Sequence, residues 1–192
     1  APTLPAWAEA STCQCGHCCN GEPTSYRPGK ARGHEIMNRI SRLLAPGNIQ
    51  IDVPVTSKKR LFEQVGQMFE DSHGLERDKV FDSLFARERL GSTGLGEAVA
   101  IPHGRIKGQR EPLAAVVRVA TPIPFDAPDG QPVQLLVFLL VPENANEEHL
   151  EILSELAELL SDDNIRHALL TETDTAAIHR ILTTWTPYHP AS

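Results

Sequence analysis

The sequence predicts an α/β fold in which helices surround a central sheet. Three observations lead to this prediction. Helical and strand patterns alternate from Met37 onward. The run Val133–Val141 is apolar with almost no polar interruption, which is typical of a strand covered on both faces. The segment Asn146–Ser161 carries its leucines at helical spacing and is the clearest helix in the chain.

The first half of this region is expected to contain one strand among three helices. In order, these are a short helix at 38–44, a strand from 49 to 53, a helix capped by Thr56 or Ser57 and ended by Gly74, and a helix at about 76–90. Ala45-Pro46-Gly47 is expected to end the short helix. The longer helix has Leu61, Val65 and Met68 on one stripe, and Gly74 suits its left-handed C-cap.

The second half is expected to contain three strands and then three helices. The strands are Ala98–Ile101, which ends in Pro102-His103-Gly104, and the β-branched-rich runs Ala114–Val119 and Val133–Val141. A turn at Ala127–Gly130 separates the last two strands. The helices are expected at 146–161, 162–170 and 174–185.

The composition argues against several classes of protein. The chain has 192 residues, of which 41% are hydrophobic, and this suits one soluble domain with a buried core. Lysine and arginine number 18 against 25 aspartate and glutamate, a net charge of −7 that argues against a general nucleic-acid binder. No apolar run approaches the roughly 20 residues that span a bilayer, and we find no signal-peptide pattern. We therefore expect a cytoplasmic protein without stable membrane insertion.

All four cysteines fall in one short segment, at Cys13, Cys15, Cys18 and Cys19. A disulfide framework would be spread along the chain, so they do not indicate one. A zinc site with His17 is conceivable, but structural zinc sites usually combine ligand pairs from separate segments. The flanking residues are rich in Pro, Gly and Ser without apolar periodicity. We predict a disordered extension over residues 1–36 and assign no metal ligand and no cofactor, with a metal site or redox chemistry as the alternatives.

Two of the histidines, His103 and His149, are candidates for chemistry. His103 stands between a proline and a glycine, so the preceding strand is expected to end abruptly at the imidazole and the backbone to turn after it. The hydroxyl groups of Ser92 and Thr93, in a nearby loop of small residues, could gather around an anion. His149 begins the long helix in phase with its leucines. The alternatives are a turn histidine without a role and a histidine packed in the core.

A long motif around His103 resembles the signature of the fructose/mannitol-type IIA proteins of the bacterial phosphotransferase system. In this sequence the motif reads Glu88-x6-Leu95-Gly96-x2-Val99-Ala100-Ile101-Pro102-His103-Gly104. The similarity continues through 125–133, 140–142 and the His149 helix, and it covers about Asn38 to Trp185. Ser57–Arg60 and Arg89–Gly94 are most similar to the nitrogen-regulatory, PtsN-type branch of the family.

The resemblance implies a role for each candidate residue. His103 corresponds to the phosphorylated histidine of the family, whose neutral imidazole can attack a phosphoryl group. Arg87 corresponds by spacing to the supporting arginine, and Arg89 is a rival for the same position. His149 corresponds to a second histidine of the site, which could hydrogen-bond the phosphoryl group or fix the tautomer of His103.

The resemblance also implies the fold and the function. The fold should be the mannitol-type IIA fold, a central mixed sheet flanked by helices on both faces, over residues 37–186, with a loose tail at 187–192. His103 would accept phosphate from a phosphorylated HPr-like carrier (NPr in this branch) and signal nitrogen, carbon or potassium status to regulatory protein targets. Such a protein is a phosphotransfer component rather than a turnover enzyme.

Two other functions stay open on the sequence. One is a sugar-specific IIA component that passes phosphate to a separate permease, and the other is a regulatory binding module that never carries phosphate. For the phosphocarrier, the docking face should surround His103 and include apolar residues such as Leu95 and Ile106.

Overall fold

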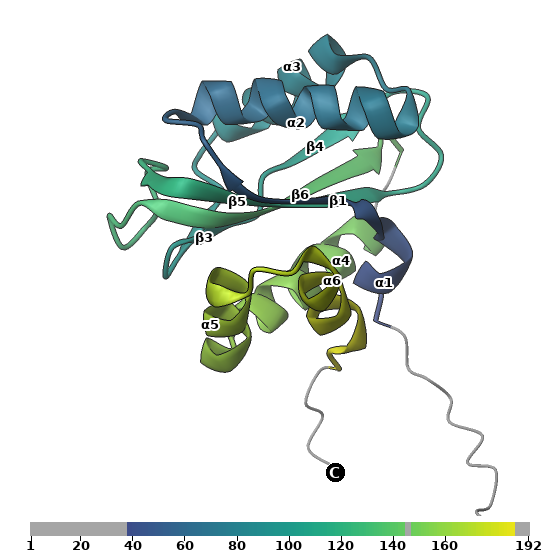
Figure 1. Ribbon diagram of the computed structural model, residues 1–192. Helices are drawn as coiled ribbons and strands as arrows, with labels where there is room; N and C mark the ends of the chain where they lie inside the picture. Colours follow the sequence, from purple (N-terminus) through teal and green to yellow (C-terminus); the bar gives the residue numbers. More distant parts are fainter. Residues whose placement is uncertain (1–37, 145–146, 187–192) are drawn as a thin grey trace, which may run out of the picture. The chain divides into compact units, whose positions relative to one another are not determined.

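The computed structural model describes residues 38–144 and 147–186 (Figure 1). The predicted extension over residues 1–36, with its four cysteines, and the predicted tail at 187–192 lie outside these residues. Within them, six strands form one mixed sheet, and helices cover both of its faces. The predicted α/β fold is therefore confirmed.

Two long antiparallel strands, β5 and β6, form the centre of the sheet. β1 pairs parallel with β5, while β3 and β4 pair parallel with β6, and β2 pairs antiparallel with β3. The strands are β1 (Leu44–Val53), β2 (Gly94–Gly96), β3 (Val99–Ala100), β4 (His103–Ile106), β5 (Leu113–Ile123) and β6 (Val133–Pro142). Because β6 has neighbours on both edges, its backbone groups are paired on both sides and it lies inside the sheet.

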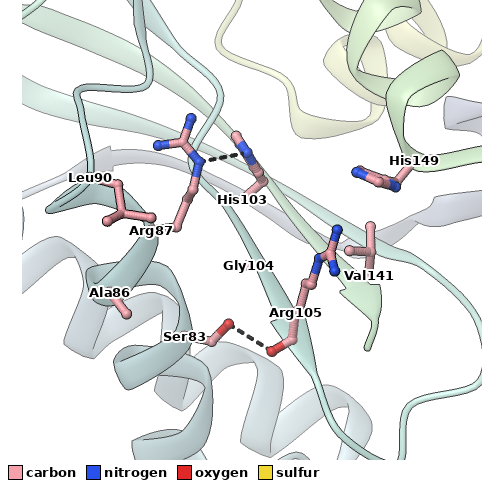
Figure 2. Close-up of a pocket in the computed structure, with 9 residues that line it drawn as sticks. All are labelled: Ser83, Ala86, Arg87, Leu90, His103, Gly104, Arg105, Val141 and His149. Carbon is pink, nitrogen blue, oxygen red and sulfur yellow. Dashed lines mark hydrogen bonds between the residues drawn. The ribbon is translucent and has the colours of Figure 1, made fainter. Parts of the chain in front are cut away.

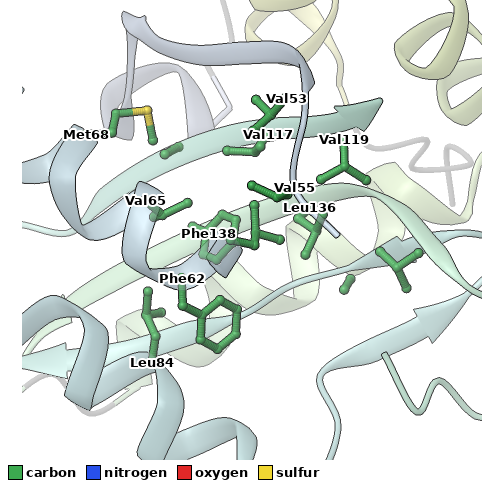
Figure 3. Close-up of a cluster of buried hydrophobic side chains, with 14 of the residues drawn as sticks. Val53, Val55, Phe62, Val65, Met68, Leu84, Val117, Val119, Leu136 and Phe138 are labelled. Carbon is green, nitrogen blue, oxygen red and sulfur yellow. The ribbon is translucent and has the colours of Figure 1, made fainter. Parts of the chain in front are cut away.

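The side chains of the central strands alternate between two hydrophobic cores. Val117, Leu136 and Phe138 face α2 and α3 (Figure 3), whereas Val116 and Val137 face α1, α4, α5 and α6. The helices are α1 (Ile40–Leu43), α2 (Lys58–His73), α3 (Arg77–Glu88), α4 (Glu147–Ser161), α5 (Asp163–Thr171) and α6 (Thr175–Thr184). This alternation explains why the sequence of β6 is apolar at successive positions.

The helix ends follow the capping signals in the sequence. Ser57 is the N-cap of α2, and its Oγ accepts a hydrogen bond from the backbone N–H of Arg60 at 3.3 Å. Gly74 ends the same helix in the left-handed conformation, with φ of 67°. Asp162 and Asp174 accept backbone hydrogen bonds in the first turns of α5 and α6. These predicted boundaries are therefore confirmed within one or two residues.

The short helix ends before Ala45-Pro46-Gly47, as predicted, but the first strand starts earlier than predicted. β1 begins at Leu44 and runs through Ala45-Pro46-Gly47, and the irregular segment is absorbed as a register shift against β5 between Leu44 and Ile49. The predicted turn after His103 is wrong, because His103 begins another strand, β4. β3 and β4 pair with β6 in the same register, although the pairing is interrupted at Ile101-Pro102. The register is kept across the interruption because the Pro102 carbonyl accepts a hydrogen bond from the Leu139 N–H at 2.9 Å.

Gly104 is a strand residue rather than the turn expected from the sequence. It lies within β4, and its φ is not in the left-handed region. A Cβ at this position would lie 2.5 Å from Ser83 Oγ and 3.2 Å from the backbone N of Leu84, both in α3. The absence of a side chain therefore lets α3 pack directly against β4.

Replacement of Gly104 by Ala is expected to lower the free energy of unfolding by about 1–3 kcal/mol, because the backbone of α3 must move away from β4. Gly47→Ala is a matched control, since a Cβ at Gly47 would have no neighbour within 4 Å. Urea unfolding of both variants and the parent measures the effect. Equal midpoints for all three would show that the contact of α3 with β4 does not need a glycine.

Candidate active site

The site is centred on a contact between Arg87, in the last turn of α3, and His103, the first residue of β4 (Figure 2). Arg87 Nε donates a hydrogen bond to His103 Nε2 at 3.0 Å, and Arg87 Nη1 donates to the Gly91 carbonyl at 3.0 Å. The second bond holds the guanidinium against the loop that follows α3. The close packing at Gly104 is what brings these two elements together.

The hydrogen bonds of His103 define its tautomer. Its Nδ1 lies 3.0 Å from the Ile101 carbonyl, which can only accept, so Nδ1 carries the proton. Nε2 is then the atom with the free lone pair, and this agrees with its acceptance of the Arg87 Nε–H. The ring therefore presents Nε2 as its nucleophilic atom.

The surroundings keep this imidazole neutral. Burial lowers the pKa of His103 below the ordinary value of 6.5, and electrostatic repulsion from the neighbouring Arg87 and His149 lowers it further. The hydrogen bond to the Ile101 carbonyl and the charge of Glu88 act in the opposite direction but do not reverse the shift. A neutral imidazole at neutral pH is the form that can attack phosphorus.

Two hollows flank the contact between Arg87 and His103. The first, of about 400 Å³, is also lined by Arg105, Val141 and His149. The Nδ1 atom of His149 is buried and has no hydrogen-bond partner among the described residues. The structure thus brings His103, Arg87 and His149 to one cavity, although the sequence separates them widely.

The second hollow, of about 430 Å³, contains Ser92 and Thr93 beside the same two residues. Their hydroxyl groups already have partners in the protein. Ser92 Oγ donates to the Phe125 carbonyl at 2.5 Å, and Thr93 Oγ1 donates to a carboxylate oxygen of Glu88 at 2.5 Å. These bonds order the loop after α3, and the binding of phosphate by the two hydroxyls stays a prediction.

A buried ion pair beneath this loop was missed by the sequence analysis. Glu88 is 7% exposed, and it accepts from Lys58 Nζ at 2.8 Å and from the Thr93 N–H at 3.1 Å. Lys58 also donates to the Phe125 carbonyl at 3.2 Å and lies 4.2 Å from the centre of its ring. Lys58 and Glu88 both belong to segments that resemble the family, and this was the signal in the sequence that could have drawn attention to them. The pair fixes the end of α3 and hence the position of Arg87.

The structure separates Arg89 from the site and changes the residues available for the predicted docking face. Arg89 is exposed and lines neither hollow, whereas Arg87 is half-buried against His103. Ile106 is only 4% exposed and belongs to the core between α2, α3 and the sheet, so its predicted place on a docking face is wrong. Leu95 is 45% exposed, and Leu90 and Leu150 are exposed to 86% and 59%. Leu90 lines the first hollow, and Leu95 and Leu150 line the second.

A comparison with known protein families shows the family to which the chain belongs. The model described as "Phosphoenolpyruvate-dependent sugar phosphotransferase system, EIIA 2" matches residues 42–185. The chain belongs to this EIIA 2 family. The match spans the sheet, its helices and both hollows, and it confirms the resemblance found in the sequence.

Relatives within the EIIA 2 family carry nitrogen-regulatory names. A nitrogen regulatory protein of Pseudomonas aeruginosa is 42% identical over 147 residues, which are 76% of this chain and 96% of the relative. The crystal structure of nitrogen regulatory protein IIA-Ntr from Neisseria meningitidis is 50% identical, has a TM-score of 0.72, and covers 75% of this chain and 99% of its own.

The mannitol-type fold is confirmed by a more distant structure. IIA mannitol of Escherichia coli has a TM-score of 0.62 at 20% identity and covers 72% of this chain and 98% of its own. Across residues 38–144 and 147–186, no helix combines the length and the apolarity needed to cross a membrane.

Proposed function

We propose that this EIIA 2 protein accepts a phosphoryl group on Nε2 of His103 from a phosphorylated HPr-like carrier, NPr in the nitrogen-regulatory branch. The observation that carries the proposal is the defined tautomer of His103, with Nδ1 held by the Ile101 carbonyl and Nε2 left as the nucleophile. The nitrogen-regulatory names of the relatives support this branch. Residues 37–186 form the domain that carries the site.

The transfer step needs little chemistry beyond positioning. The Nε2 lone pair attacks phosphorus, and the bond from phosphorus to the nitrogen of the donor histidine breaks, with its electron pair returning to that nitrogen. The imidazole of His103 keeps its Nδ1 proton and gains positive character. The Ile101 carbonyl, which already accepts from Nδ1, stabilises that charge.

Arg87 and His149 support the same step. Arg87 gives up its bond to Nε2, and its guanidinium fork turns to the phosphoryl oxygens, while Nη1 stays close to the Gly91 carbonyl. His149 lines the same cavity as His103, and its ring can donate to a phosphoryl oxygen or help to orient the phosphorylated imidazole.

The phosphorylation state would then be read by regulatory proteins that respond to nitrogen, carbon or potassium status. The exposed Leu90, Leu95 and Leu150 around the site offer these partners and the carrier an apolar contact area. A sugar-specific component that feeds a separate permease is the second candidate, because the family description names a sugar phosphotransferase system.

The test is phosphotransfer from a purified, phosphorylated carrier. Incubation with phosphorylated NPr should give one acid-labile phosphate per chain, and mass spectrometry should locate it on His103. Parallel rates with the HPr of a sugar system separate the two candidates, since a nitrogen-regulatory protein should be faster with NPr. A chain that takes phosphate from neither carrier would contradict the proposal and favour a binding module without phosphate.

His103 should be mostly neutral at pH 6.5 and above, since its pKa is lowered from that value. An NMR titration of its ring protons should give a midpoint below 6.5, and phosphate uptake should fall as the pH decreases through that midpoint. Between the lowered pKa and pH 6.5, the unfolded chain binds more protons at His103 than the folded chain does. The free energy of unfolding should therefore decrease as the pH is lowered through this range. A midpoint above 6.5 would contradict the neutral, buried imidazole.

A further inference from the structure

Arg105 is a cation of the first hollow that the transfer step described above does not use. It follows His103 by two positions on β4, and both residues line the cavity of about 400 Å³. Side chains two positions apart on a strand leave the sheet on the same side, with Cα atoms about 6.6 Å apart. The burial along β4 follows this rule, because His103 and Arg105 are accessible while Gly104 and Ile106 are buried.

The backbone of Arg105 is held in place, and its guanidinium forms no ion pair with the side chains that the structure describes. Ser83 Oγ in α3 donates to the Arg105 carbonyl at 2.8 Å, which fixes the strand at this residue. The ion pairs formed among the side chains of residues 38–144 and 149–186 do not include Arg105. In Figure 2 its side chain extends from β4 along the hollow toward His149, while Arg87 approaches His103 from α3.

Among the described residues, the charged and titratable side chains that line this hollow are all basic. They are Arg87, His103, Arg105 and His149, and none of the described lining residues is an aspartate or a glutamate. The whole chain has a net charge of −7, so this local excess of positive charge is not a consequence of overall composition. A cavity with these properties favours an anion.

We propose that Arg105 is a second phosphate-binding side chain, which contacts the phosphoryl group once it is bonded to His103. This inference rests on the proposed function, since the anion is the transferred group itself. Arg87 forms one wall and can engage two of the three terminal oxygens through its fork, while Nη1 also has the Gly91 carbonyl as a partner. Arg105 takes the oxygen on the side of His149, and the two arginines together match the charge of the group.

The contact exists only in the phosphorylated state, so it stabilises that state and shifts the transfer equilibrium. The equilibrium constant compares free carrier and free protein before and after transfer. A residue that acts only in docking of the carrier changes the rates in both directions and leaves this constant unchanged. The measurement therefore separates binding of the phosphoryl group from binding of the carrier.

The experiment mixes phosphorylated NPr with the full chain at several ratios and measures the phosphorylated fraction of each protein at equilibrium. Arg105→Gln should lower the equilibrium constant about five- to tenfold, the range expected for a charge-assisted hydrogen bond at an accessible site. Arg105→Lys should recover part of the loss, and the difference between the parent and Arg105→Gln should shrink at high salt.

Arg110→Gln is the matched control, because Arg110 is an exposed arginine a few residues along the chain that does not line the hollow. It should leave the equilibrium constant unchanged. Equal constants for the parent and Arg105→Gln would overturn the inference, as would a change in rate alone, which would assign Arg105 to carrier docking. Equal losses in both Gln variants would also overturn it. Failure of the proposed function is distinguishable, since the parent chain would then take no phosphate on His103.

Discussion

Replacement of His103 by Ala should abolish the uptake of acid-labile phosphate from the phosphorylated carrier. The reason is chemical rather than steric, since the variant loses the only imidazole of the site whose free nitrogen is defined by two hydrogen bonds. His149 lines the same hollow, but its Nδ1 is buried, and no carbonyl among the described residues sets its tautomer. Transfer of radiolabelled phosphate, followed by gel separation under alkaline conditions, measures the loss.

Two further variants make this result interpretable. His103→Gln keeps an amide that can donate to Ile101 and accept from Arg87, so the fold is preserved without a nucleophile. His167→Ala removes an exposed histidine of α5 and should take phosphate like the parent. Phosphorylation of His103→Ala at the parental rate would place the acceptor on another residue and end the assignment.

Replacement of Arg87 by Ala should slow phosphate uptake by about 10²–10³-fold, comparable to the loss of a preorganised donor that stabilises charge in a transition state. The side chain is already in contact with the reacting nitrogen, 3.0 Å from Nε2, and needs only a small rotation to reach the phosphoryl oxygens. Its loss also removes a positive charge that lowers the pKa of His103, so more of the imidazole is protonated at neutral pH. Single-turnover kinetics with saturating phosphorylated carrier measures the rate.

Arg89→Ala is the matched control for charge and position. Arg89 follows α3, is exposed, and lines neither hollow, so its variant should stay within about threefold of the parental rate. Arg87→Lys should be intermediate, because it keeps the charge without the planar fork. Slow phosphate uptake by Arg89→Ala together with a parental rate for Arg87→Ala would assign the supporting role to Arg89 instead of Arg87.

The fold was largely predictable from sequence because its signals are local. Ser57 and Gly74 act on the backbone within a few residues of themselves, and the almost uninterrupted apolar run of β6 indicates a strand covered on both faces. The start of β1 and the path of the chain after His103 were predicted wrongly, because β1 and β4 pair with strands that are distant in sequence. Such pairing compensates for a local irregularity that appears decisive in the sequence alone.

The site was predictable only in part. His103 and His149 were candidates from their positions in the sequence, and Arg87 came from the resemblance to the family. The cavity that the three residues share could not have been obtained from spacing. The ion pair between Glu88 and Lys58 joins residues 30 positions apart, so it depends on how α2 packs on α3. The tautomer of His103 likewise needed the three-dimensional position of the Ile101 carbonyl.

That carbonyl has a consequence for how the site tolerates mutation. The group that sets the protonation of the nucleophile belongs to the main chain, and every amino acid supplies it. Ile101 can therefore be exchanged for another residue that fills the same core position without loss of the tautomer, provided that the chain keeps its path. A substitution of Ile101 is therefore expected to change the packing of the core and to leave the tautomer of His103, and with it the reactivity of Nε2, unchanged.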